Sequence, residues 1–319
     1  MEVCPINTID VSVIVLTYYH EQYIARALDS ILSQETTYSY EIIVSDDCSG
    51  DSTVDIVNQY IEKYPHIIRL IRHENNIGTC QNIYDAMLTC AGRYIETTDG
   101  DDMWIIKDKL QRQVDFLDTH PDYFVHSVLI EGRYPDGSLT GKIYPMNKSL
   151  WGKEFSIDTL VGGESFSTAG SMMRNFFKQD KVKNEFGMLP KFSKCIEDLP
   201  MNFMYYDFGK AYLSDYVGYG ITHRRKSDEN QHNYNTIFNV YSQAIDHIKL
   251  IKNMQEYFGD RYDFSAWLVP RAADLIIVSI KERNPSFLVE IPELKFKYWF
   301  RIFCLLVRKA FNKLDNLIR

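Results

Sequence analysis

Apolar residues along the first 120 positions follow two alternating patterns. Four short apolar or β-branched runs suit strands that are buried on both faces, and they span residues 11–17, 40–46, 67–71 and 93–98. Four intervening segments place apolar residues at helical spacing, and they span residues 21–32, 52–64, 79–90 and 107–119. This alternation predicts an α/β fold in which a doubly wound, mostly parallel sheet is flanked by helices.

The pattern changes in the second half of the chain. Residues 123–219 are irregular and mixed, apart from a helix expected at 195–206, whereas residues 234–283 have helical periodicity. No internal repeat and no low-complexity linker interrupts the sequence. We therefore predict one large domain over residues 1–230, followed by a helical C-terminal extension over residues 231–319.

Composition and charge narrow the class of protein. The chain has 319 residues, of which 45% are hydrophobic, and this is enough for a sizeable core. Its formal net charge of −8 argues against a nucleic-acid partner. Six cysteines without CxxC spacing argue against a zinc site or a disulfide framework. Since we see neither a signal peptide nor an uncharged apolar stretch of about 18 residues, we expect a cytoplasmic protein without a spanning helix.

The C-terminal residues differ in character from the rest of the chain. From residue 290 onward seven Lys and Arg residues oppose three acidic ones, so this segment is net +4 and the preceding chain net −12. Residues 294–319 are aromatic, apolar and basic, which suits a helix on an anionic membrane surface, at the inner face of the cell membrane. The alternative is a C-terminal helix docked on the body of the protein or on another subunit.

Acidic residues gather after two of the predicted strands. Asp99, Asp101 and Asp102 follow the fourth strand, and carboxylates so close together are typical ligands of a divalent hard cation such as Mg²⁺ or Mn²⁺. Asp46 and Asp47 follow the second strand. Because ligand sites in open α/β sheets form outside the carboxyl ends of the strands, both groups are expected at one edge. The alternatives are an acidic surface loop and an Asx turn with a helix cap.

Four segments together resemble a known family. They follow the order and spacing of the motifs of the family 2 glycosyltransferases, and they are residues 11–17, 43–51, 75–78 and 98–102. The resemblance covers roughly residues 10–225. It implies a GT-A fold, whose nucleotide-binding half spans about 10–120 and whose acceptor half spans about 121–230.

The resemblance also implies an activity. Members of this family are metal-dependent, inverting enzymes that move a sugar from a nucleotide-diphosphate donor, commonly a UDP-sugar, to a hydroxyl group. The expected acceptor is a saccharide or a lipid-linked saccharide. The expected setting is bacterial capsule, O-antigen or exopolysaccharide biosynthesis.

The resemblance implies roles for individual residues. The positions that match the nucleotide-binding motifs are Thr17, Glu21, Asp46, Asp47, Asn76, Gly78, Asp99 and Asp101. Asp102, with Asp101, matches the ligands of the cation, which is expected to be Mn²⁺ or Mg²⁺. Asp198 matches the general base for the acceptor hydroxyl, and Glu197 matches a residue that supports or orients the acceptor. From the residues alone, an exposed helix start is the favoured explanation of this pair.

Other segments match the family less closely. His223, Arg224 and Arg225 lie near the family segment that closes over the phosphates and are expected to bind the diphosphate, with a solvated basic loop as the alternative. Residues 163–171 resemble the segment on the acceptor side, with an ordinary turn into a strand as the alternative. Trp104 suits either sugar stacking or aromatic packing.

One departure from the family pattern concerns the phosphates. The family often carries Ala-Arg-Asn where this chain has Cys80, Gln81 and Asn82. An arginine near the phosphates is therefore missing, or it is supplied by Arg72 or a later residue.

Two other functions compete with glycosyl transfer. A nucleotidyltransferase that makes nucleotide sugars needs a Gly-rich basic loop after the first strand, and residues 17–21 do not form one. A non-catalytic subunit that binds nucleotide sugars need not keep both the acidic cluster and Asp198. A dinucleotide-dependent oxidoreductase is excluded because no GxGxxG motif follows a strand.

Overall fold

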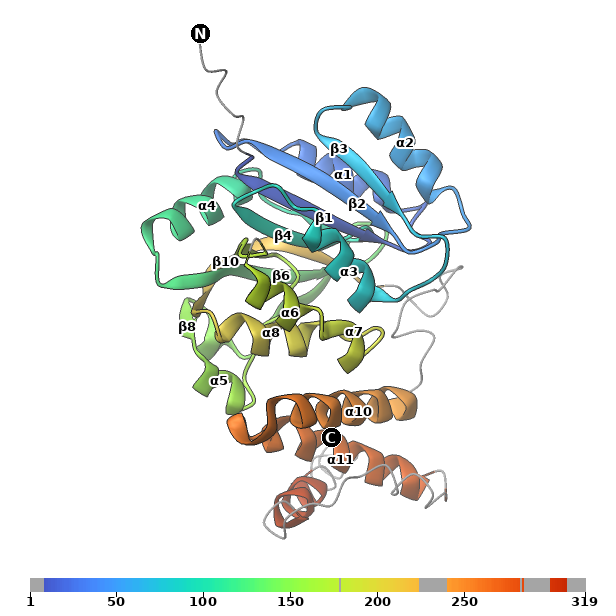
Figure 1. Ribbon diagram of the computed structural model, residues 1–319. Helices are drawn as coiled ribbons and strands as arrows, with labels where there is room; N and C mark the ends of the chain where they lie inside the picture. The colour runs from blue at the N-terminus through green and yellow to red at the C-terminus, as the bar shows by residue number, and fades with distance from the viewer. Residues whose placement is uncertain (1–8, 178, 224–239, 282, 284–298, 309–319) are drawn as a thin grey trace.

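A ten-stranded mixed sheet organises the molecule (Figure 1). The computed structural model describes residues 9–177, 179–223, 240–281, 283 and 299–308. The strands run in the order β3-β2-β1-β4-β9-β6-β10-β5, while β7 pairs with β6 and β8 with β10. Their bounds are β1 Val11–Thr17, β2 Tyr40–Asp46, β3 Ile68–Arg72, β4 Tyr94–Asp99, β5 Met103–Trp104, β6 Tyr123–Arg133, β7 Leu139–Tyr144, β8 Lys153–Phe155, β9 Ser171–Arg174 and β10 Lys210–Thr222.

The first half of the sheet is parallel, as the sequence predicts. β3, β2, β1 and β4 pair in parallel, and the register places Thr17 beside Asp46 and Leu16 beside Asp99. The carboxyl ends of three strands therefore meet at one edge. The second half is mixed, since β9 is antiparallel to both β4 and β6 while β6 and β10 are parallel.

Helices cover both faces of the sheet (Figure 1). Their bounds are α1 Ile24–Leu32, α2 Thr53–Lys63, α3 Thr79–Leu88, α4 Lys109–Thr119, α5 Ile157–Val161, α6 Asp180–Phe186, α7 Leu189–Phe192, α8 Asp198–Tyr206, α10 Val240–Phe258 and α11 Ser265–Lys281. Side chains alternate along a strand, so Val13 of β1 joins a core with α1, α2 and α4, whereas Ile14 joins a core with α3, α6 and α8. This explains why the first strand is apolar at nearly every position.

Several predicted helices differ from the observed ones at their ends. The helix expected at 21–32 begins at Ile24, because residues 21–23 form a turn. The helix expected at 195–206 begins at Asp198. The single helical stretch expected at 234–283 is two helices, α10 and α11, separated by a turn in which Gly259 has φ +58°. Residues 234–239 lie outside the described part of the chain.

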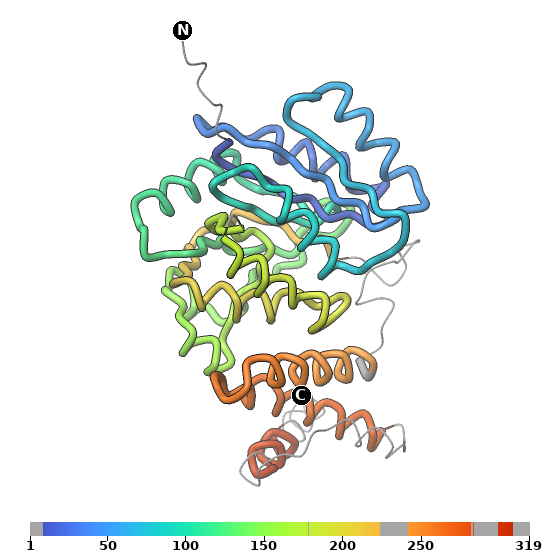
Figure 2. The backbone as a smooth tube through the Cα atoms, viewed as in Figure 1, coloured from blue at the N-terminus to red at the C-terminus, as the bar shows by residue number. Residues whose placement is uncertain are grey.

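The helices of the C-terminal extension share an apolar core with residues 1–230. Ile248 and Met254 of α10 are buried in the same apolar cluster as Phe192, Leu199 and Phe203. Figure 2 shows α10 and α11 against the end of the molecule that lies away from β3 and α2. Among the described residues, no helix has the length and the apolar content needed to cross a bilayer.

A charged pair is buried between the sheet and α4. The Lys109 ammonium contacts the Glu96 carboxylate, donates to Gln113 Oε1 at 2.7 Å, and lies 4.4 Å from the ring centre of Trp104. Burial lowers the pKa of Lys109 and raises the pKa of Glu96. Trp104 is itself buried, which supports the packing role over sugar stacking.

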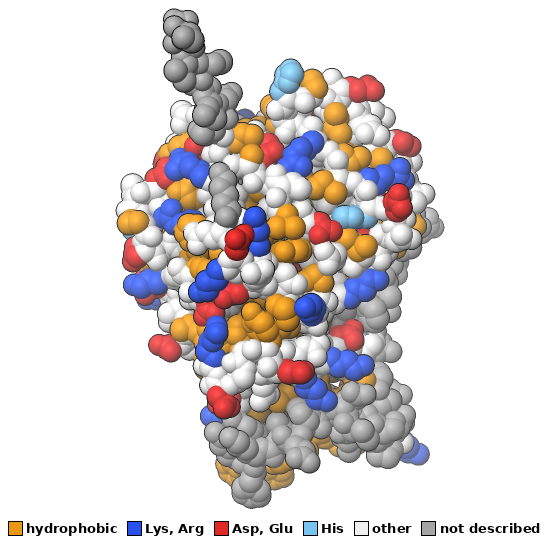
Figure 3. Space-filling model, viewed as in Figure 1, with side chains coloured by type: hydrophobic (Ala, Val, Ile, Leu, Met, Phe, Trp, Pro, Cys, Tyr) orange, Lys and Arg blue, Asp and Glu red, His pale blue; other side chains and the backbone are white. Residues whose placement is uncertain are grey.

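On the face drawn in Figure 3, acidic and basic side chains of the described residues are interspersed and form no single-sign patch.

Candidate functional site

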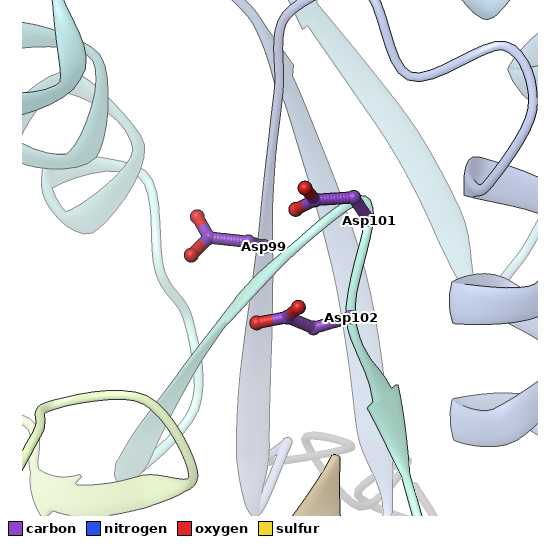
Figure 4. A group of neighbouring side chains, drawn as sticks. All are labelled: Asp99, Asp101 and Asp102. Atoms are coloured by element: carbon purple, nitrogen blue, oxygen red, sulfur yellow. The ribbon is translucent and has the colours of Figure 1, made fainter. Parts of the chain in front are cut away.

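Three carboxylates meet at the end of β4 (Figure 4). One oxygen from each of Asp99, Asp101 and Asp102 lies within 4.8 Å of the other two. The turn between them is held against β1, because the Gly100 N–H donates to the Leu16 carbonyl at 2.7 Å. An all-oxygen donor set with this spacing fits a hard divalent cation, which would offset the mutual repulsion of the three acids.

Asp102 is the buried member of this acidic cluster. Its carboxylate accepts hydrogen bonds from the Tyr219 hydroxyl at 2.9 Å and from the Thr222 N–H at 2.8 Å. Burial raises the pKa of Asp102 well above its ordinary value, and the carboxylates of Asp101 and Asp99 raise it further. Asp99 and Asp101 are partly exposed, so a ligand can approach them from solvent.

Two residues that the sequence analysis did not identify surround the cluster. Arg26 of α1 donates to the Asp101 carbonyl at 2.9 Å and to Thr222 Oγ1 at 2.8 Å. His20 Nε2 lies 3.7 Å from the Asp101 carboxylate. Neither residue belongs to a sequence motif, and both reach the cluster because β1 is the neighbour of β4.

Asp47 connects the end of β2 to the loop before α3. Its carboxylate accepts from Asn76 Nδ2 at 2.9 Å, from the Ile77 N–H at 2.7 Å and from the Gly78 N–H at 3.0 Å. Asp46 accepts from the Ser49 N–H at 3.0 Å, three residues further along, so its side chain holds the loop after β2. The structure thus brings Asp46, Asp47, Asn76 and Gly78 together.

Thr17 ends β1, and Glu21 lies on the loop that follows this strand. The Thr17 carbonyl accepts from the Asp47 N–H at 3.0 Å, and Thr17 itself is buried. Glu21 accepts from the Ser52 N–H at 3.0 Å, so it joins the loops after β1 and β2. Both loops contain a non-glycine residue with positive φ, Tyr19 at +57° and Cys48 at +66°, and such strain is frequent at functional sites.

Gly78 lies where the loop before α3 approaches the segment before α8. It has φ +86°, and a Cβ there would lie 2.3 Å from Lys194 Cγ and 2.6 Å from the Lys194 carbonyl oxygen. The Cys80 N–H donates to that same carbonyl at 3.2 Å. Only glycine permits this approach, which places the Lys194–Asp198 segment beside the Asn76–Gly78 loop.

Asp198 and Glu197 stand at the N-terminal end of α8. Asp198 Oδ1 accepts from the Thr168 N–H at 3.0 Å and contacts the Thr168 hydroxyl. Glu197 is half-buried, and burial raises the pKa of its carboxyl, as do the carboxylates of Asp198 and Asp99. Asp99 of the acidic cluster therefore acts electrostatically on Glu197 at the start of α8.

A cavity of about 510 Å³ opens beside Asp198. Its size falls within the range of roughly 300–1,000 Å³ that is usual for small-molecule sites. Its walls come from residues 128–223 and from α10 and α11 of the extension. The lining residues are Val128, Ile130, Tyr144, Pro145, Ser165, Phe166, Ser167, Ile196, Asp198, Leu199, Ile221, His223, His247, Ile251, Trp267 and Arg271.

Comparison with known proteins identifies the family. Residues 12–177 match the model described as "Glycosyl transferase family 2". This chain belongs to that family. The match spans the acidic cluster and the loops around it, and it ends before Asp198.

The chain is also similar to part of longer curated proteins. An uncharacterized protein of Mycobacterium tuberculosis, Rv1520, is 31% identical over 197 residues, which are 62% of this chain and 51% of that protein. The chain therefore spans about half the length of the curated relatives that head the comparison.

Two solved structures share the fold. TarS of Staphylococcus aureus, residues 1–349 with UDP-GlcNAc, has a TM-score of 0.55 at 18% identity and covers 88% of this chain and 89% of that one. The mannosyltransferase PcManGT of Pyrobaculum calidifontis, with GDP-Man and Mn²⁺, has a TM-score of 0.57 at 16% identity and covers 98% and 83%. These neighbours and the family match confirm the predicted GT-A fold.

The segments that matched the family loosely have mixed outcomes. Ser165 and Ser167 line the cavity, so the 163–171 segment does lie on the side of Asp198. His223 also lines the cavity, and its Nε2 is 3.3 Å from the Tyr144 hydroxyl. Arg224 and Arg225 lie outside the described residues, so their expected diphosphate contacts stay predictions.

The sequence analysis of this glycosyltransferase missed the contribution of the extension to the cavity. His247 and Ile251 of α10 and Trp267 and Arg271 of α11 form one wall. The helical periodicity of residues 234–283 indicated a buried face, but nothing in that pattern identified what the face covers.

Proposed function

We propose that this glycosyltransferase is metal-dependent and inverting, and that it moves a sugar from a nucleotide-diphosphate donor to an acceptor hydroxyl. One observation carries the proposal: a cavity opens beside Asp198, and Glu197, the neighbour of Asp198, lies close enough to Asp99 of the acidic cluster for that carboxylate to raise its pKa. Such an arrangement holds a leaving group on one side and a nucleophile on the other. A nucleotide-sugar-binding subunit without catalysis does not require Asp198 beside this cavity.

Asp101 and Asp102 would hold the cation, with Asp99 beside them for the nucleotide. A divalent ion supplies Lewis-acid neutralisation of the charge that develops on a departing diphosphate. Mn²⁺ and Mg²⁺ both fit an oxygen donor set, and PcManGT was solved with Mn²⁺. The nucleoside is proposed to lie against the loops of Thr17, Glu21 and Asp47, since they form the edge of the sheet next to the cluster.

Asp198 is proposed to take the proton from the acceptor hydroxyl. Thr168 holds one oxygen of its carboxylate, Oδ1, which orients the other oxygen for proton transfer. Glu197 would support the acceptor. With one base and one leaving group on opposite sides of the sugar, a single displacement inverts the anomeric centre.

The class of donor and the setting rest on the neighbours. TarS was solved with UDP-GlcNAc and PcManGT with GDP-Man, so a nucleotide sugar is the proposed donor and a UDP-sugar the first to test. The poly(ribitol-phosphate) β-N-acetylglucosaminyltransferase TarS of Staphylococcus aureus is a relative that is 34% identical over 111 residues. We therefore place this protein in bacterial surface-polysaccharide assembly, with a saccharide or lipid-linked saccharide as acceptor.

Isothermal titration with UDP and GDP tests the donor side. At least one of them should bind in the presence of Mn²⁺ or Mg²⁺ and lose most of its affinity with a chelator. Asp101→Asn should weaken metal-dependent binding by about 10-fold or more, because a charged ligand is lost. Asp55→Asn, an exposed acid on α2, is the matched control. Binding that is indifferent to both chelator and Asp101→Asn would refute the metal assignment.

We also propose that the C-terminal segment contacts an anionic membrane surface. The exposed face of residues 299–308 supports this proposal. This segment is helical, and Ile302 is buried against Val269, Ala272 and Ala273 of α11. The same segment exposes large apolar side chains, namely Trp299, Phe300, Phe303 and Val307, and it carries Arg301 and Arg308. Docking on α11 and contact with an anionic membrane surface are therefore compatible.

Vesicle sedimentation tests this second proposal. The wild-type protein should sediment with vesicles that contain anionic lipid, and the double variant Phe300→Ser, Phe303→Ser should sediment several-fold less. Leu139→Ser, an exposed apolar residue on β7, is the control. Equal sedimentation of all three proteins would contradict the membrane contact.

A further inference from the structure

The cavity beside Asp198 is chemically polarised. Its catalytic-body wall carries the carboxylate of Asp198, while its extension wall carries Arg271 of α11. Of all the lining residues named above, which belong to the described chain, Arg271 alone has a permanent positive charge. A carboxylate and a guanidinium thus face the same space from walls that are unrelated in sequence.

The surroundings of Arg271 leave it able to bind a ligand. Asp274 is its ion-pair neighbour, but the separation of 3.9 Å is at the limit of such a contact, and the Arg271 side chain is 43% exposed. A loose, exposed pair of this kind is worth little. His247 lies close enough for Arg271 to lower its pKa, after the larger effect of burial, so at neutral pH the histidine is a neutral hydrogen-bonding neighbour.

The rest of the wall suits a sugar ring. Trp267 lines the cavity, and its indole N–H donates to the Leu160 carbonyl at 2.8 Å, which fixes the ring in place. Sugar rings pack on indole faces through their C–H groups, and the serine and tyrosine hydroxyls of the opposite wall provide polar partners. The cavity therefore combines an aromatic surface, hydroxyl groups, one acid and one guanidinium.

We infer that the acceptor is an anionic saccharide whose phosphate or carboxylate group is bound by Arg271, with its reactive hydroxyl directed to Asp198. This inference rests on the proposed function, because it assigns the cavity to the acceptor. The orientation follows from charge: an anionic group is repelled by Asp198 and attracted to Arg271 of α11, which lines the same cavity. Guanidinium groups bind both phosphate and carboxylate oxygens in a forked geometry.

Binding of three small probes tests the inference. The probes are α-D-glucose 1-phosphate, D-glucuronate and methyl α-D-glucoside, titrated with the donor side filled by Mn²⁺ and the nucleoside diphosphate that binds. At least one charged probe should bind more tightly than the neutral one. Arg271→Gln should lower the affinity for that probe by about 10- to 100-fold, as expected for the loss of a charge-assisted hydrogen bond. Arg271→Lys should restore part of this affinity. The probe that responds identifies the anion as phosphate or carboxylate.

Controls separate this inference from a structural effect. Lys281→Gln removes an exposed positive charge from the same helix and should leave all affinities unchanged. Arg271→Gln should also leave nucleotide binding and the neutral probe unchanged. If both charged probes bind no better than the neutral one, or if Arg271→Gln leaves their affinity intact, the inference is wrong.

The proposed function can fail separately. If neither UDP nor GDP binds with metal, the donor assignment falls, yet the same probes titrated without nucleotide still report on Arg271. If a nucleotide binds and the Arg271 variants behave as wild type, only the anionic acceptor is refuted.

Discussion

The regions that we propose as the donor side and the acceptor side are built in different ways. On the donor side, the acids follow adjacent strands, and Asp47 and Asp102 are each held by two or more hydrogen bonds. On the acceptor side, Asp198 is held through Thr168, and the adjoining cavity is closed by α10 and α11. The donor side is thus a property of the sheet edge, whereas the acceptor side depends on how the extension packs.

This difference indicates where the two specificities reside. The nucleotide loops are tied to β1, β2 and β4, so a change there disturbs the parallel sheet itself. The cavity wall on α10 and α11 can change its side chains while the sheet edge stays intact. We therefore expect donor chemistry to tolerate variation in the extension, and acceptor choice to follow it.

The largest effect is expected at Asp198, where the two sides meet. Asp198→Asn should lower turnover by about 10²–10⁴-fold, since this is the usual contribution of a general base. Metal-dependent nucleotide binding should stay within about 2-fold of wild type, because the acidic cluster is untouched. Release of nucleoside diphosphate from the sugar donor measures the first, and titration calorimetry measures the second. Turnover close to wild type would place the base elsewhere.

Glu197→Gln is the paired comparison for Asp198→Asn. Its effect on turnover should be smaller, because Glu197 supports the acceptor and does not take the proton. Burial and nearby carboxylates raise the folded-state pKa of Glu197, so the folded protein binds a proton that the unfolded chain releases. Wild-type stability therefore falls as the pH rises above about 4.3, the ordinary glutamate value, until the raised pKa is passed. In metal-free protein, urea denaturation at several pH values should show that the free energy of unfolding decreases less with rising pH in the glutamine variant than in wild type.

A smaller effect is expected where Gly78 joins the two sides. Gly78→Ala adds a methyl group against Lys194 at a residue with positive φ, and should lower the free energy of unfolding by about 2–4 kcal/mol. Nucleotide affinity and turnover should fall together, since the loop that Asp47 holds is displaced toward the segment of Asp198. Urea denaturation and calorimetry measure these changes.

Gly137→Ala is the matched control for Gly78→Ala. Gly137 has φ +83°, and its added Cβ would meet nothing within 4 Å, so it reports the backbone cost alone, about 1 kcal/mol. If the two alanine variants lose equal stability, the close approach of Gly78 to Lys194 contributes nothing and the two sides are less tightly joined than proposed.

Local patterns made much of the donor side predictable. β1 and β2 have the predicted bounds, because apolar β-branched runs are strong signals for buried parallel strands. The meeting of Asp46, Asp99 and Thr17 followed from the parallel register alone. The break at Gly259 was missed, although the glycine is a visible stop signal between two periodic stretches.

The partners of the acids were not predictable in the same way. Asp102 is bonded by Tyr219 and Thr222, which lie 117 and 120 residues further along the chain. Thr168 reaches Asp198 across 30 residues, and Trp267 and Arg271 reach the cavity from the second helix of the extension. Thr168 lies in the 163–171 segment, but Tyr219, Trp267 and Arg271 belong to no motif, because each is selected by its position in space.

The sequence by itself determined the family, the parallel donor half and the edge at which the acids gather. These properties depend on short-range periodicity and on the fact that parallel strands end at the same edge. Only the tertiary structure decided how the acids are held, which residues close the cavity and that Arg271 and Asp198 line it together. Those properties come from packing between segments that are distant in the chain, and packing of this kind leaves no periodic trace in the sequence.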